Sequence, residues 1–168
     1  MRFALGLILA LGLLPAQAQE KRLKIAVVDS GLDFNNPDFK PFICEGHAHI
    51  DLTGTGFQDD IGHGTNVTSA ITKSQDHKKI CIIVVKIFKA FEVNQIPAYA
   101  FNQIASVDAD IFNFSWSSGP AYAPTERRMI STLIRNRRHI VLSAGNASTD
   151  LSKTCNLYPV CYGRLFPN

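Results

Sequence analysis

Four short apolar runs, rich in β-branched residues and showing little alternation of polar and apolar side chains, constrain the fold of this 168-residue chain most. Such runs are typical of parallel strands that are buried on both faces. Segments with helical spacing separate them, which is the pattern of β-α-β units. We therefore expect an α/β fold with a twisted parallel sheet and helices on both of its faces. The expected strands are residues 24–28, 80–87, 110–114 and 139–143.

Two segments between these runs carry apolar side chains at helical spacing, residues 97–107 and 125–136. A third helix is expected over residues 66–72. Thr125 is a residue type that caps helix amino ends, so we expect it to be the N-cap of its helix. Residues 39–61 are rich in Gly, Asp and His, which predicts a loop.

The first residues have the features of an export signal. Arg2 precedes an apolar run over residues 3–14, and Ala16-Gln17-Ala18 fits a cleavage pattern. The run has twelve residues, whereas a bilayer span needs roughly 20, so a retained membrane anchor is the weaker interpretation. We expect a signal peptide at residues 1–18, one partial domain at 19–168, and a secreted or periplasmic protein.

The charge of the chain indicates neither a nucleic-acid partner nor a membrane partner. The formal net charge is +3, and it falls to +2 when Arg2 is removed, because 16 Lys and Arg then face 14 Asp and Glu. Five arginines lie between residues 127 and 138, and at this net charge a solvated helix face explains them better than an anion-binding surface.

The four cysteines are compatible with disulfides, because an exported chain reaches an oxidising compartment. They allow three pairings. We favour Cys155 with Cys161, which are close in sequence, and therefore Cys44 with Cys81. Free buried thiols remain the alternative.

Polar residues follow the expected strands at their carboxyl ends, where open parallel sheets bind ligands. Asp29 ends the first strand, a Ser-rich segment follows the third, and Asn146 follows the fourth. His63 lies between two glycines at the start of the third expected helix. A buried carboxylate fixes the tautomer of a histidine that acts as a base, and an amide donates to a developing oxyanion.

Four segments, in this order along the chain, resemble motifs of the subtilisin-like serine peptidases. The residues around Asp29 resemble the aspartate motif and those around His63 the histidine motif, while two later segments resemble the substrate-binding strand and the oxyanion segment. The matching segments are residues 25–33 with 36–39, residues 62–71, residues 111–117 and residues 141–146. Each motif alone is weak, but four in order make chance similarity a poor explanation.

The resemblance implies a role for each matching residue. Asp29 would orient the histidine, His63 would be the general base and Asn146 the oxyanion donor, with Ser115-Trp116-Ser117 beside a protein or peptide substrate. It also implies a three-layer sandwich and a chemistry that requires no cofactor. Asp38 matches a position that binds calcium in some members, so a structural calcium ion is a further expectation.

The sequence also departs from the family pattern. Asn36 and Asn66 stand where histidines are common, and Thr68-Ser69 replaces Ala-Gly. The family's nucleophile motif, Gly-Thr-Ser before a small-residue helix, does not occur in the 168 residues. We therefore expect the chain to correspond to the amino-terminal portion of such a peptidase, truncated at its carboxyl end and inactive alone. The alternative is an inactive relative that binds peptides along the Ser115 strand edge.

A second pattern, His47-Ala48-His49-Ile50-Asp51, resembles the zinc ligands of metallo-β-lactamase-like hydrolases. That family continues with histidine, where this chain has Leu52. Solvated histidines are therefore the favoured interpretation, and zinc is the alternative.

Overall fold

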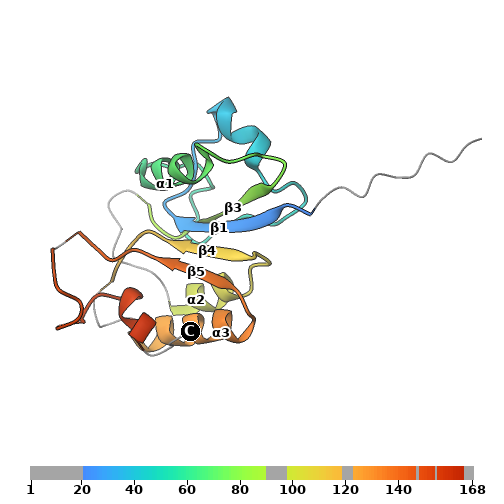
Figure 1. The fold of residues 1–168 in the computed structure, drawn as a ribbon. Helices are drawn as coiled ribbons and strands as arrows, with labels where there is room; N and C mark the ends of the chain where they lie inside the picture. The colour runs from blue at the N-terminus through green and yellow to red at the C-terminus, as the bar shows by residue number, and fades with distance from the viewer. Residues whose placement is uncertain (1–20, 90–97, 119–122, 147, 154, 165–168) are drawn as a thin grey trace, which may run out of the picture.

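Five parallel strands form one sheet in the order β2-β3-β1-β4-β5 (Figure 1). The computed structural model describes residues 21–89, 98–118, 123–146, 148–153 and 155–164, and the strands are those found in these ranges. The expected signal peptide lies outside them. The strands are β1 (Leu23–Asp29), β2 (Ile50–Asp51), β3 (Ile80–Lys86), β4 (Ile111–Phe114) and β5 (His139–Leu142).

Helices lie on both sides of this sheet (Figure 1). The α-helices are α1 (His63–Thr72), α2 (Ala98–Ala105) and α3 (Ala123–Arg135), and the short 3-10 helices are η1 (Pro37–Phe42) and η3 (Val160–Arg164). In the described ranges, no helix combines the length and the apolar character that crossing a bilayer requires.

Alternating side chains of the central strands supply two separate cores, as the pleat of a strand requires. Ala26 and Val28 of β1 face a large core that includes α2 and α3. Ile25 and Val27 face a smaller core on the opposite side, against which Val67 of α1 packs. The α/β fold with helices on both faces is therefore confirmed.

The sequence located four of the strands to within one residue at each end, but several local expectations are wrong. Strand β2 lies inside the segment expected to be a loop; its two residues are too few to produce a periodic pattern. Helix α1 begins at His63, three residues earlier than expected. Thr125 is not an N-cap, because α3 begins at Ala123 and its first turn accommodates Pro124.

The expectation that every strand is covered on both faces is wrong for β5. This strand is an edge of the described sheet, and its residues alternate between exposed and partly buried. Val141 is 52% exposed. Its apolar sequence resembles that of the buried strands, so the difference arises from its position in the sheet rather than from its composition.

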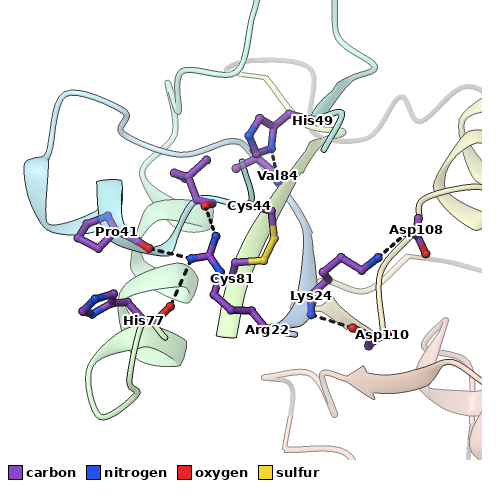
Figure 2. The surroundings of a disulfide bond; sticks show 11 residues. Arg22, Lys24, Pro41, Cys44, His49, His77, Cys81, Val84, Asp108 and Asp110 are labelled. Atoms are coloured by element: carbon purple, nitrogen blue, oxygen red, sulfur yellow. Dashed lines mark hydrogen bonds and ion pairs between the residues drawn. A yellow bond between two sulfur atoms is a disulfide. The ribbon is translucent and has the colours of Figure 1, made fainter. Parts of the chain in front are cut away.

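Two disulfides connect the four cysteines, with the pairing that the sequence favoured. Cys44 is joined to Cys81 near the amino end of β3, and Cys155 is joined to Cys161 after β5. Figure 2 shows that the first disulfide lies beside Arg22 and Lys24. Arg22 donates hydrogen bonds to the carbonyl oxygens of Pro41, Ile43 and His77, which holds the start of the chain against two other segments.

Candidate active site

The carboxyl ends of three adjacent strands meet at one edge of the sheet, and a cleft of about 600 Å³ opens there. The cleft is lined by residues that follow β1, β4 and β5, by the start of α1, and by two apolar side chains. These residues are Asp29, Ser30, Ile61, His63, Phe88, Ser115, Trp116, Ser117, Ser143, Gly145 and Asn146. The structure thus brings together Asp29, His63, Asn146 and the Ser115–Ser117 segment.

Asp29 and His63 form the central contact of the cleft. His63 Nδ1 lies 2.7 Å from Asp29 Oδ1, which also accepts the Ser30 N–H at 2.8 Å. The Asp29 side chain is 1% exposed, whereas the His63 side chain is 52% exposed. An ionised Asp29 requires a proton on Nδ1, which leaves Nε2 as the basic nitrogen of the ring.

Burial raises the pKa of Asp29 above its ordinary value, although hydrogen bonds from His63 and from the Ser30 N–H oppose the shift. In the described part of the chain, the buried second oxygen Oδ2 has no hydrogen-bond partner. A carboxylate in this setting is poorly solvated by its surroundings. A neighbouring imidazolium would therefore stabilise it more strongly than it would stabilise a solvated carboxylate.

Two glycines allow the end of β1 to lie close to α1 and to the loop before it. A Cβ at Gly64 would lie 2.4 Å from the carbonyl oxygen of Gly31, and a Cβ at Gly31 would lie 2.6 Å from that of Phe57. Gly31 also has a φ of +112°, a left-handed conformation that favours glycine. A side chain at Gly64 would separate α1 from the end of β1, and one at Gly31 would push the end of β1 away from the loop at Phe57 and Asp59.

The segment after β4 contributes both to the cleft and to the core. Trp116 lines the cleft but is 8% exposed, and its Nε1–H donates to the carbonyl oxygen of Val28 at 3.1 Å. Its ring contacts those of Phe88 and Phe114 edge to face. Ser115 accepts a hydrogen bond from the side chain of Asn113 at 2.9 Å. Trp116 is therefore a core residue whose outer face borders the cleft.

The segment after β5 carries the amide. Asn146 is exposed and lines the cleft. Gly145 before it has a φ of +83°, and its N–H donates to Ser143 Oγ at 3.1 Å. This turn directs the chain away from β5 at the same edge where Asp29 ends β1.

The model of the subtilase family matches residues 20–164, which is most of the chain and includes every cleft residue. This chain belongs to the subtilase family. The resemblance expected from the sequence motifs is thereby confirmed.

Two bacterial serine proteases match along most of the chain. The major intracellular serine protease of Bacillus subtilis is 28% identical over 86% of this chain and 50% of its own length. The intracellular serine protease of Paenibacillus polymyxa is 25% identical over 89% of this chain and 49% of its own length. The chain therefore spans about half the length of these two relatives.

A solved structure supports the fold assignment. The crystal structure of a lanthipeptide protease superposes with a TM-score of 0.67 at 19% identity, over 82% of this chain and 45% of that protein. At this identity, the likeness shows that the two share a fold. The fold is thus the amino-terminal part of a subtilase sandwich.

Some of the residues singled out in the sequence lie away from the cleft. Asp38 is an exposed residue in the first turn of η1. His49 Nδ1 accepts the Val84 N–H at 3.0 Å (Figure 2), so that nitrogen is engaged. Asp51 accepts hydrogen bonds from Thr53 and Gly56. Within the described ranges, no group of three or more His, Cys, Asp or Glu side chains is placed to hold a metal ion. A calcium site at Asp38 stays a prediction.

Sequence reasoning missed two polar residues at the site, Ser30 and Asp59. Ser30 Oγ donates to Asp59 Oδ1 at 2.9 Å and accepts the Gly64 N–H at 2.9 Å. It therefore joins the aspartate segment to the histidine segment. An acidic residue shortly before a helix is a recognised start signal, and Asp59 lies four residues before His63. Asp59 precedes the N-cap Gly62 by three residues, however, so that signal alone does not identify it.

Proposed function

We propose that this subtilase acts as a serine endopeptidase, with His63 as the general base, Asp29 as the residue that orients it, and Asn146 as the oxyanion donor. The contact between Asp29 Oδ1 and His63 Nδ1, at the edge of the cleft that Asn146 also lines, is the observation that supports the proposal most. The substrate would be a protein or peptide lying along Ser115, Trp116 and Ser117.

Each step except the nucleophilic attack then has a residue to perform it. The hydroxyl oxygen of a serine attacks the carbonyl carbon of the peptide bond, and His63 Nε2 takes the hydroxyl proton. The Asn146 amide donates to the oxygen that becomes negatively charged. His63 returns the proton to the amine as the bond between carbon and nitrogen breaks. Water then attacks the acyl-enzyme, with His63 again accepting a proton, and releases the acid and the serine.

The nucleophilic serine is the one component without a candidate among the motifs of this chain, because no Gly-Thr-Ser occurs in the 168 residues. We propose that the 168-residue polypeptide alone has no more than residual activity, since a missing triad member leaves only the effects of binding and the oxyanion donor. The family's nucleophile motif would be needed for full turnover.

We further propose that the protein is exported after cleavage of residues 1–18. The two disulfides support this location, because disulfides persist in oxidising compartments. The two bacterial relatives, in contrast, are named as intracellular proteases. Amino-terminal sequencing of protein recovered from the periplasm or the medium tests the proposal. A first residue near Gln19 is expected, and an intact Met1 on protein recovered only from the cytoplasm would contradict it.

A serine-directed phosphonate provides the test of the peptidase activity. Sequencing of the coding region past Asn168 establishes whether an in-frame Gly-Thr-Ser follows. Polypeptide 19–168 should neither hydrolyse fluorogenic peptides nor react with the phosphonate, whereas a protein that includes the motif should do both. Robust, phosphonate-sensitive hydrolysis by residues 19–168 would contradict the assignment of roles.

A peptide-binding protein without hydrolytic activity is the second candidate. The observation that favours it is that Ser115, Trp116 and Ser117 continue past the last register pair of β4, Phe114 with Leu142, and line an open cleft. A peptide could align beside such a segment through main-chain hydrogen bonds. Saturable peptide binding without cleavage, together with a stop codon after Asn168, would favour this candidate over the peptidase.

A further inference from the structure

The carboxylate of Asp59 accepts five hydrogen bonds near the cleft, although it does not line the cleft itself. Oδ1 accepts from Ser30 Oγ at 2.9 Å, from the Ile61 N–H at 3.0 Å and from the Gly62 N–H at 2.8 Å. Oδ2 accepts from both the N–H and the hydroxyl of Thr65, at 2.9 and 2.7 Å. One side chain therefore binds groups from two separate segments of the chain.

One of these segments is the amino end of α1, which begins at His63. The first N–H groups of a helix have no partner within the helix and need acceptors. Gly62 is the N-cap, and it has no side chain to provide one. Asp59 supplies the acceptor, and its negative charge also suits the positive end of the helix dipole. The turn that carries His63 is therefore fixed by Asp59.

The other segment is the end of β1. Ser30 follows Asp29 directly, and Gly64 follows His63 directly. Ser30 Oγ donates to Asp59 and accepts the Gly64 N–H at 2.9 Å, so a single hydroxyl lies between the two segments. Any movement of Asp59 would be transmitted to the backbone on both sides of the contact between Asp29 and His63.

The loop that carries Asp59 is itself anchored to the sheet. Lys86 is 1% exposed, and its Nζ donates to the carbonyl oxygen of Gln58 at 2.7 Å and lies 3.2 Å from Asp60 Oδ1. Lys86 is the register partner of Asp29 on the neighbouring strand. The residues on both sides of Asp59 are thus held at the same edge of the sheet as Asp29.

Asp59 remains negatively charged at neutral and at mildly acidic pH. Burial alone would raise the pKa of this carboxyl group, but hydrogen bonds from Thr65, Gly62 and Ile61 lower it to about 2. The carboxylate is therefore ionised at neutral pH.

We propose that Asp59 is a positioning residue, whose carboxylate fixes the amino end of α1 against Ser30 and thereby holds the His63 imidazole on Asp29. The inference rests on the proposed function, since it assigns Asp59 a purpose only if His63 is the base. A residue that merely caps α1 would stabilise the fold without controlling the orientation of the imidazole ring.

The NMR signal of the His63 Nδ1 proton distinguishes these two roles in the 168-residue chain, without any need for turnover. A proton held between Nδ1 and a carboxylate gives a strongly downfield resonance that weakens when exchange with water is fast. Asp59→Asn removes the charge and turns one acceptor toward Thr65 into a donor, so the resonance should be lost or broadened. Asp51→Asn is the matched control. Asp51 ends β2 and accepts similar hydrogen bonds from Thr53 and Gly56, which lie, like Asp59, between β2 and α1.

Asp51→Asn should keep the resonance even if it lowers the melting temperature by a similar amount. An unchanged resonance in folded Asp59→Asn would overturn the proposal, and so would an equal loss in both variants. If Asp59→Asn does not fold, Ser30→Ala decides, because it removes the hydroxyl between the segments and leaves the hydrogen bonds from Ile61, Gly62 and Thr65 to Asp59 in place. The resonance should weaken in Ser30→Ala, and an unaltered resonance there would overturn the proposal as well.

Kinetics of a protein that includes the nucleophile give an independent readout. A mispositioned base should lower kcat by up to about 10²-fold with little change in KM. Absence of the downfield resonance in the unsubstituted chain would count against the proposed function itself. Its presence there, with no response to Asp59→Asn, would count against the role of Asp59 alone.

Discussion

The polar side chains at the two ends of the sheet differ in their hydrogen bonding and in their exposure to solvent. At the amino end, the cations have partners: Arg22 donates to three carbonyl oxygens, and Lys24 Nζ binds Asp108 beside the Cys44–Cys81 disulfide (Figure 2). At the carboxyl end, three polar side chains of the cleft are open to solvent or incompletely bonded. His63 is half-exposed, Asn146 is exposed, and the buried Asp29 Oδ2 has no partner in the described ranges.

The comparison separates the residues that stabilise this fold from those that could do chemistry. A group whose hydrogen bonds are all satisfied within the protein has little capacity to bind a substrate. A half-exposed imidazole against a buried carboxylate retains that capacity, at a cost in stability that other parts of the fold offset. Substitutions at the amino end should therefore alter stability, and substitutions at the carboxyl end should alter function.

The largest expected effect is the loss of the base. His63→Ala, in a protein that includes the nucleophile, should lower kcat by about 10²–10⁴-fold. The melting temperature should change little, because the side chain is half-exposed. His77→Ala is the control, since that side chain has the same exposed fraction and lies near the amino end of β3. Comparable activity in the two variants would show that the two ends do not differ in function.

Removing the disulfide at the amino end should have the next largest effect, on stability alone. Chain entropy predicts that Cys44→Ala with Cys81→Ala lowers the free energy of unfolding by about 4 kcal/mol, because the two cysteines are 37 positions apart. Cys155→Ala with Cys161→Ala should cost about 2 kcal/mol, since these are six positions apart. Guanidinium titration measures both. A larger loss in the second pair would show that the region after β5 contributes more to stability than loop closure predicts.

Asp59 should contribute a stability that depends on pH. Its pKa is about 2 in the folded protein and about 3.8 in the unfolded chain, so folding is favoured where the carboxylate is ionised. The contribution, on the order of 2 kcal/mol, is fully present above about pH 4 and is lost as the pH falls through about 2. Asp59→Asn should lower the free energy of unfolding near pH 7 and have a much smaller effect near pH 2, where the carboxyl group is half-protonated. An equal loss at both values would show that charge is not the cause.

Asp29 should contribute a stability whose dependence on pH has the opposite sign to that of Asp59. Its pKa is raised in the folded protein by burial, so the unfolded chain ionises first and stability falls as the pH rises above about 3.8. Asp29→Asn should therefore raise the free energy of unfolding at pH 7, while activity is lost because the amide does not stabilise an imidazolium. Urea titrations at pH 3 and pH 7 measure the difference. A loss of stability at pH 7 greater than at pH 3 would contradict the assignment of Asp29 as a residue kept for function.

Much of the fold could be predicted because buried parallel strands produce long apolar runs. The limits of β1 and β3 followed from those runs, whereas β2 has two residues and did not. The exposure of β5 could not be predicted, because edge and central strands have similar sequences. Asp29 and His63 were found because the residues around them resemble motifs of the family. Asp59 was overlooked among several acidic residues in one loop, since its role depends on contacts with Ser30 and Thr65 that only the tertiary structure shows.

The tautomer of His63 tests the central claim most directly. Nitrogen-15 NMR of the ring, recorded on the 168-residue chain at a pH where the imidazole is neutral, shows which nitrogen carries the proton. The geometry predicts a proton on Nδ1, facing Asp29, and a free Nε2. A proton on Nε2 would contradict the account, because that nitrogen could not then accept a proton from a nucleophile.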